Sequence, residues 1–263
     1  MRVMTALARR VPAEDLIYLA DTGRGPYGRR PVAEVRRWTE ECAYYLLRFD
    51  PKVLVVTCHT MGAVAGEDLR KRLPVPVFLA PGLLCQQAAR LTAGTEGPLA
   101  LLASETALAT GLYQRMLGGA EVVCCPVTPL LQALEGRASQ DEVRALLDQS
   151  LAPAREVGAS TVLLAEGSLA EVADLVGNVL GVGARVVDVV EELVGEVEHM
   201  LEMTVLSRPH GGDGGRYVFV SGDAEDFRER GARVSGEFAD RRIRVDAASP
   251  ERFFQQMATL REG

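Results

Sequence analysis

Short apolar runs alternate with helical patterns along most of the chain. Runs of strand type lie at 15–20, 52–57, 75–80, 98–103, 121–125, 161–165 and 184–189. Because they are almost continuously apolar rather than strictly alternating, they are typical of parallel strands covered on both faces. The regular succession of strand and helix patterns therefore predicts an α/β fold.

The helical segments between the strands carry one-sided apolar stripes. In 35–49, Trp38, Cys42, Tyr45 and Phe49 share one face of a predicted helix. Ser104 is placed as the N-cap of another helix. The stretch 188–206 predicts a long amphipathic helix that carries the chain from one lobe to the other, and a glycine-rich connection follows at 207–215. The tail predicts a strand at 216–223, a helix, an arginine-rich strand at 241–247 and a last helix from Pro250.

The first residues open directly in a helical pattern. Val3, Leu7 and Val11 recur at i, i+4 and i+8, with no strand ahead of them. A parallel sheet built from βα units usually has a strand before its first helix. We therefore expect a strand that this sequence does not contain.

Composition narrows the class of protein. The 263 residues are 48% hydrophobic, which is enough for a large core, and the net charge is −7 with scattered basic residues, which argues against nucleic-acid binding. No apolar run is long enough for a membrane span, and no secretory signal is recognisable. The chain has 5 cysteines and no C-x-x-C pair, which predicts free thiols in a cytoplasmic protein. The 3 histidines are dispersed, so we expect no metal site.

Polar residues follow one of the predicted strands at the point where a helix begins. Cys58, His59 and Thr60 come directly after the run 52–57. Ligands of parallel α/β sheets bind beyond the carboxyl ends of strands, close to helix N-termini. A thiol there is expected to have a lowered pKa, because the helix dipole stabilises its anion. The alternative is a structural cysteine buried at a strand end, and the pattern alone leaves both open.

A second junction has the same form. The run 161–165 is followed by Glu166, Gly167 and Ser168, which align with Cys58, His59 and Thr60. If the two halves are related by a pseudo-two-fold axis, Cys58 and Glu166 flank one cleft and can remove and deliver a proton on opposite faces of a carbon atom. Alternatively, Glu166 only complements a helix dipole.

Several segments resemble a known family over nearly the whole chain. These are "VPAEDLIYLADTGRGPYGRRP", "VVTCHT", "VPVFLAPG", "ETALATGLYQRML", "CPVTPLLQALEG" and "YVFVSGDAEDFRERG". In order and spacing they are similar to glutamate racemases of the aspartate/glutamate racemase superfamily. That resemblance implies two pseudo-symmetric lobes, each a mostly parallel sheet flanked by helices, with the site in the cleft between them. We expect residues 1–80 plus 191–263 to form the first lobe and residues 81–190 the second.

The resemblance also implies an activity. The family interconverts L- and D-glutamate without a cofactor, with two cysteines on opposite faces of the α-carbon, and the product supplies peptidoglycan synthesis. We accordingly expect a small acidic amino acid as the ligand, a homodimer, and no nucleic-acid or membrane partner.

Matching the motifs position by position gives the candidate site. Cys58 matches the first catalytic cysteine, and four further residues match substrate-holding positions. These are Tyr27, Gly28, His59 and Thr60. Where the family has its second motif, G-C-T-H, this chain has Ala165–Ser168, so the second cysteine and its histidine are replaced. Glu166 then takes the second catalytic position, and Ser168 becomes a candidate substrate contact.

The family's opening strand, with its Asp-Ser-Gly loop, is also missing, and we interpret this as a misassigned or trimmed start.

Three hypotheses about function follow from these departures from the family pattern. The first is a racemase with asymmetric bases, Cys58 and Glu166. The second is a single-cysteine decarboxylase or isomerase, and the third is a degenerate racemase homologue that binds a metabolite or a protein in regulation.

Overall fold

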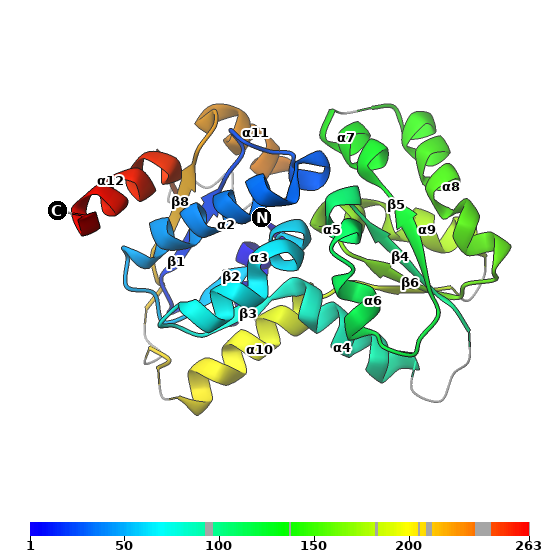
Figure 1. The fold of residues 1–263 in the computed structure, drawn as a ribbon, viewed down its shortest axis with the longest axis horizontal. Helices are drawn as coiled ribbons and strands as arrows, with labels where there is room; N and C mark the ends of the chain where they lie inside the picture. Colours follow the sequence, from blue (N-terminus) through cyan, green and yellow to red (C-terminus); the bar gives the residue numbers. More distant parts are fainter. Residues whose placement is uncertain are drawn as a thin grey trace.

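The chain folds into two α/β lobes that lie side by side, as Figure 1 shows. The structure is a computed structural model, which describes residues 1–92, 97–136, 138–181, 184–204, 206–208, 212–234 and 243–262. All strand pairs in these residues are parallel. The predicted α/β class is therefore confirmed.

The sheet of one lobe has four strands in the order β5-β4-β6-β7. Their bounds are β4 (Leu99–Ala103), β5 (Val122–Pro126), β6 (Thr161–Leu164) and β7 (Arg185–Val187). Every residue of β4 and β6 is buried, which explains why both read as unbroken apolar runs. Both strands end at the same edge, because Leu102 pairs with Leu164 in register.

The other lobe contains two separate groups of strands. β1 (Leu16–Ala20) pairs with β8 (Arg216–Val220), which pairs with β9 (Arg244–Ala247), while β2 (Leu54–Val56) pairs only with β3 (Val77–Leu79). Within the described residues, no strand pairs with the second edge of β1 or of β2. Among the described strands, one edge of β1 and one edge of β2 therefore have no partner strand.

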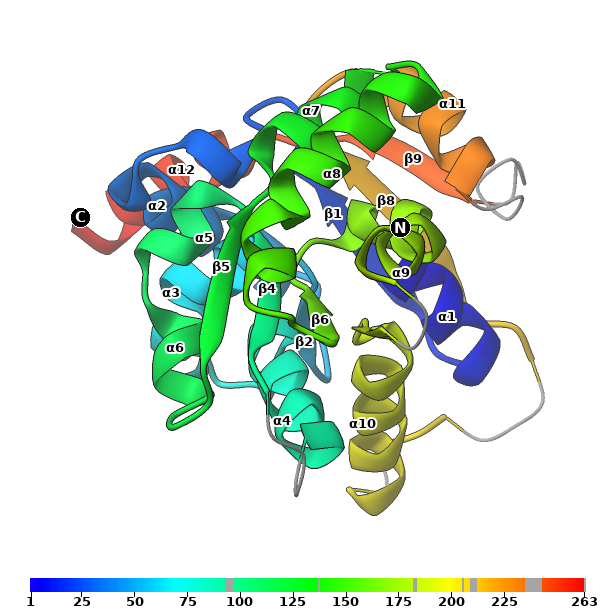
Figure 2. The ribbon, with the colours of Figure 1, turned by 90° about the vertical axis from the view of Figure 1, so that its right-hand side faces the viewer.

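Helices cover both lobes (Figure 1; Figure 2). The α-helices are α1 (Arg2–Arg10), α2 (Val32–Leu47), α3 (His59–Arg72), α4 (Ala80–Thr92), α5 (Glu105–Ala109), α6 (Leu112–Met116), α7 (Thr128–Gly136), α8 (Gln140–Glu156), α9 (Ala173–Leu180), α10 (Val190–Met203), α11 (Ala224–Val234) and α12 (Pro250–Glu262), with two 3-10 segments, η1 (Tyr27–Arg29) and η2 (Gly167–Val172). None of the helices in the described ranges is long and apolar enough to cross a membrane.

Most predicted elements are present. Each predicted strand corresponds to one of β1–β9, and the long amphipathic helix is α10. The Ser104 side chain caps α5 by accepting a hydrogen bond from the backbone of Ala107, as predicted. The lobe boundaries at 80/81 and 190/191 stay a prediction, although helices α4 and α10 begin at Ala80 and Val190. Most of the glycine-rich connection 207–215 is described, but residues 209–211 lie outside the described ranges.

Helices α3 and α5 bring the two lobes together. The first turn of α3 follows β2, the first turn of α5 follows β4, and the two helices pack against each other. The carboxyl ends of strands from both lobes therefore meet in one region.

Candidate active site

A cavity of about 910 Å³ lies at this meeting point. It is lined by residues of β1, β2, α2, α7, α11 and the segments that follow β2 and β6. Every predicted site residue except His59 lines it: Cys58, Glu166, Tyr27, Gly28, Thr60 and Ser168. The two junctions identified in the sequence therefore face one space.

Cys58 is the N-cap residue of α3, directly after β2. The backbone N–H groups of Thr60 and Met61, in the first turn of the helix, favour its thiolate and act to lower the pKa. Burial, and to a smaller extent the Glu166 carboxylate, nevertheless raise the pKa of the Cys58 thiol to about 12. The expectation of a lowered pKa is wrong, because burial outweighs the N–H groups of the helix. The thiol is neutral over the physiological range.

Glu166 is the second candidate proton-transferring group. It follows β6 in extended conformation and precedes η2, so its side chain enters the cavity from the opposite lobe. The Thr60 hydroxyl donates to its Oε1 at 2.8 Å. Burial raises the pKa of Glu166 to about 7, while the hydroxyl groups of Thr60 and Ser104 lower it. The carboxyl group is therefore poised to accept and release a proton near neutral pH.

The loop before η1 forms the wall beside Cys58. The Tyr27 ring packs on Trp38 with 5.6 Å between ring centroids, and its hydroxyl donates to the carboxylate of Asp21. Gly28 lies against Ser104: a Cβ atom on Gly28 would come within 2.8 Å of the Ser104 Cβ. A side chain at position 28 would therefore push this loop away from the cavity.

A buried charge cluster holds that loop in place. Asp21 accepts hydrogen bonds from Arg24 Nε at 2.7 Å and from Ser221 Oγ at 2.5 Å, in addition to the Tyr27 hydroxyl. Arg24 also pairs with Glu41, and the side chains of Asp21 and Glu41 are each only 5% exposed. Such buried charges are tolerated only when paired and hydrogen-bonded. The cluster thus fixes the backbone that presents Tyr27 and Gly28.

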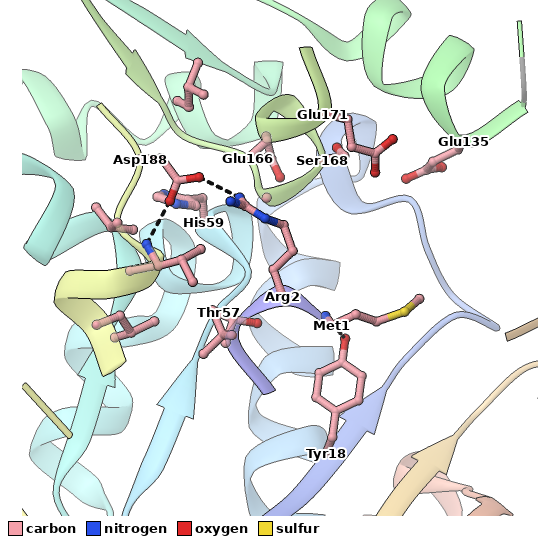
Figure 3. A pocket seen from close by; sticks show the side chains of 17 residues that line it. Met1, Arg2, Tyr18, Thr57, His59, Glu135, Glu166, Ser168, Glu171 and Asp188 are labelled. Carbon is pink, nitrogen blue, oxygen red and sulfur yellow. Dashed lines mark hydrogen bonds and ion pairs between the residues drawn. The ribbon is translucent and has the colours of Figure 1, made fainter. Parts of the chain in front are cut away.

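His59 and Ser168 differ in placement. Ser168 lines the large cavity and also a second cavity of about 340 Å³, where Figure 3 shows it near Glu166 and Glu171. His59 lines only the smaller one, and its Nδ1 lies 3.0 Å from the hydroxyl of Tyr113. Burial lowers the pKa of His59 to about 4, so the ring is neutral. A substrate-holding role for His59 stays a prediction.

Sequence reasoning missed several residues of the site. Ser104 follows β4 as Cys58 follows β2, and its Oγ lies 2.8 Å from Thr60 Oγ1. That shared position, a polar residue directly after a buried strand, could have identified it. Glu135 and Arg230 line the cavity from α7 and α11. No local motif marks these two, because their meeting depends on the packing of the lobes.

Metal binding receives no support from the described side chains. No group of three or more His, Cys, Asp or Glu residues within the described ranges could hold a metal ion. The absence of a cofactor stays a prediction.

The raised pKa of Glu166 predicts an effect on stability. Because its pKa is about 7 in the folded chain against an ordinary 4.5, the folded state holds the proton more tightly. Its stabilising contribution is complete below pH 4.5 and is lost as the pH rises through 7. We expect the unfolding free energy of Glu166→Gln, relative to the native chain, to increase by about 3 kcal/mol over that range. Urea denaturation at several pH values measures it, and a constant difference would contradict the shift.

A cavity at the carboxyl ends of parallel strands, with a thiol and a carboxyl group facing it from different lobes, is a candidate acid–base site in a two-lobed α/β fold. The sequence profile of the Asp/Glu/Hydantoin racemase family matches residues 1–197. The chain belongs to this family. A glutamate racemase of Thermus thermophilus is 32% identical over 235 residues, which cover 89% of this chain and 88% of that protein.

Solved structures show the same fold. A glutamate racemase isoform from Bacillus anthracis superimposes with a TM-score of 0.86 at 22% identity, over 94% of this chain and 92% of that one. The glutamate racemase of Francisella tularensis, solved in complex with D-glutamate, gives 0.83 at 16% identity, over 95% and 93% of the two chains. The predicted resemblance to glutamate racemases is confirmed.

Proposed function

We propose that this protein is a cofactor-independent amino-acid racemase in which Glu166 and Cys58 transfer protons at the α-carbon of a glutamate-like substrate. The observation that carries the proposal is that both groups line one cavity, where Glu166 is hydrogen-bonded to Thr60, two residues after Cys58. Two groups that face one cavity from different lobes can reach one carbon atom from two sides.

The roles follow from protonation. The Glu166 carboxylate takes the α-proton, and the neutral Cys58 thiol gives its proton to the other face of the carbon. This leaves a protonated carboxyl group and a thiolate, so exchange of one proton with solvent or between the two groups restores the starting state. In the reverse reaction the thiolate accepts the proton and the Glu166 carboxyl group donates one.

The substrate assignment rests on the relatives. The Thermus relative is a glutamate racemase, and the Francisella structure holds D-glutamate. We extend to this chain the acidic amino-acid substrate and a supply of D-glutamate for peptidoglycan. The homodimer and the cytoplasmic location also remain proposals.

One observation favours a second candidate function. A thiol with a pKa of about 12 is a good proton donor but a poor base near neutral pH. A single-cysteine decarboxylase or isomerase needs only the donor. A degenerate homologue that only binds a ligand needs neither the removal nor the delivery of a proton.

Incubation with L- or D-glutamate in D₂O, followed by proton NMR and chiral chromatography, tests the proposal. We expect interconversion accompanied by α-proton exchange, with a rate that rises with pH through about 7 as Glu166 loses its proton. The Cys58 thiol stays protonated over this range, so the rate reaches a plateau at higher pH. Exchange without interconversion would favour the single-cysteine enzyme, and no exchange with either enantiomer would favour the binding protein.

A further inference from the structure

Ser104 is buried at the centre of the contact between the lobes, although no sequence motif assigned it to the site. It directly follows β4, and its side chain is fully buried. Its Oγ accepts a hydrogen bond from the backbone N–H of Ala107 at 3.3 Å, which makes it the N-cap of α5. This bond uses a lone pair of the oxygen, so the hydroxyl hydrogen remains free to donate into the site.

The direction of the hydrogen bonds follows from the number of hydrogens. Thr60 has one hydroxyl hydrogen, and it is donated to Glu166 Oε1 at 2.8 Å. While Glu166 is ionised, the 2.8 Å contact between Ser104 and Thr60 therefore has Ser104 as donor. A directed chain therefore runs from the backbone of α5 through Ser104 and Thr60 to one oxygen of the Glu166 carboxyl group.

Neighbouring contacts prevent this chain from shifting. Thr106, two residues after Ser104, donates to the backbone oxygens of Gly28 at 3.0 Å and of Arg30 at 2.9 Å. Gly28 in turn packs directly against Ser104, and Thr60 is only 2% exposed. The junction after β4 thus holds both the Tyr27 loop and the hydroxyl groups that meet Glu166.

We propose that Ser104 is a positioning residue for the proton transfer: through Thr60 it fixes the Glu166 carboxyl group with Oε1 occupied, so that Oε2 is the oxygen that exchanges the α-proton. The role in turnover rests on the proposed function, but the hydrogen-bonded arrangement can be measured without it. Ser104 touches neither substrate nor reacting atoms in this role. It acts by keeping the carboxylate oriented and its ionised form stabilised.

The titration of Glu166 tests this assignment. In protein labelled with ¹³C at glutamate side-chain carboxyl groups, the Glu166 signal is identified by its loss in Glu166→Gln. Ser104→Ala removes the donor that orients the Thr60 hydroxyl toward the charged carboxylate, which should raise the midpoint by about one pH unit. Thr60→Val, which leaves the cap of α5 intact, should raise it similarly, and Thr60→Ser should leave it unchanged.

Ser139→Ala is the matched control. Ser139 is also an N-cap serine, bonded to the backbone N–H of Glu142 at 3.2 Å, but it belongs to α8 and is absent from the lining of the large cavity. Its loss removes a helix cap without touching the chain of hydrogen bonds, so the Glu166 midpoint should not move. An unchanged midpoint in both Ser104→Ala and Thr60→Val would overturn the assignment.

The same experiment separates the inference from the proposed function. If the native protein exchanges α-protons, the pH dependence of exchange should move upward with the NMR midpoint in Ser104→Ala. If the native protein exchanges no α-protons but the Glu166 midpoint moves in Ser104→Ala, the proposed function fails and the positioning of Glu166 by Ser104 is upheld. A pH dependence that stays fixed while the midpoint moves would overturn the role of Ser104 in turnover.

Discussion

Replacing Glu166 with glutamine should lower the rate of α-proton exchange of glutamate by a factor on the order of 10²–10⁴. Glutamine keeps the size of the side chain and can still accept the hydrogen bond from Thr60 at its amide oxygen. It cannot take up a proton, however, and the Cys58 thiol that remains is a poor base because its pKa is about 12. The measurement is the decay of the α-proton signal in D₂O.

Glu171→Gln is the control for this variant. Glu171 lines the same cavity and has the same type of side chain, but it lies on the exposed part of η2. A general loss of negative charge in the cavity would slow both variants equally. Equal rates for the native protein and Glu166→Gln would remove Glu166 from the mechanism.

Replacing Asp21 with alanine should lower the free energy of unfolding by roughly 3–5 kcal/mol, the usual cost of breaking a buried ion pair from one side. The substitution leaves the Arg24 guanidinium with Glu41 as its remaining carboxylate partner and removes the acceptor from Tyr27 and Ser221. Urea denaturation can be followed through Trp38, the only tryptophan, whose ring lies beside Tyr27. Because the Tyr27 loop is also released, we expect weaker substrate binding.

An exposed pair provides the comparison. Arg70 and Glu67 lie 3.0 Å apart with side chains 46% and 49% exposed. Glu67→Ala should change the unfolding free energy by less than about 1 kcal/mol. A similar small change in Asp21→Ala would show that the buried cluster does not hold the loop.

The strands and the two polar junctions could be predicted from local sequence. A strand buried on both faces needs apolar residues throughout, and β4 and β6 show this directly. The positions of Cys58 and Glu166 followed from one rule, that polar residues after a buried strand lie at the carboxyl edge of a sheet. The same rule applied to Ser104 would have added it to the site.

Protonation could not be predicted in this way. The sequence shows that Cys58 precedes a helix, which favours the thiolate, but not how deeply the thiol is buried, which decides the result. Likewise the pKa of Glu166 depends on its burial and on hydroxyl groups from Thr60 and Ser104, each on a different element. His59 follows Cys58 directly but turns to Tyr113, because consecutive residues at a helix start point in different directions.

The central claim is that Cys58 and Glu166 act on opposite faces of one α-carbon, and Cys58→Ala tests it most directly. With pure L- or D-glutamate in D₂O, this variant should exchange the α-proton of one enantiomer only and form none of the other. Glu166 can still remove and return the proton on its own face of the α-carbon, whereas the opposite face has lost Cys58. Exchange of both enantiomers, or interconversion at the native rate, would contradict the account.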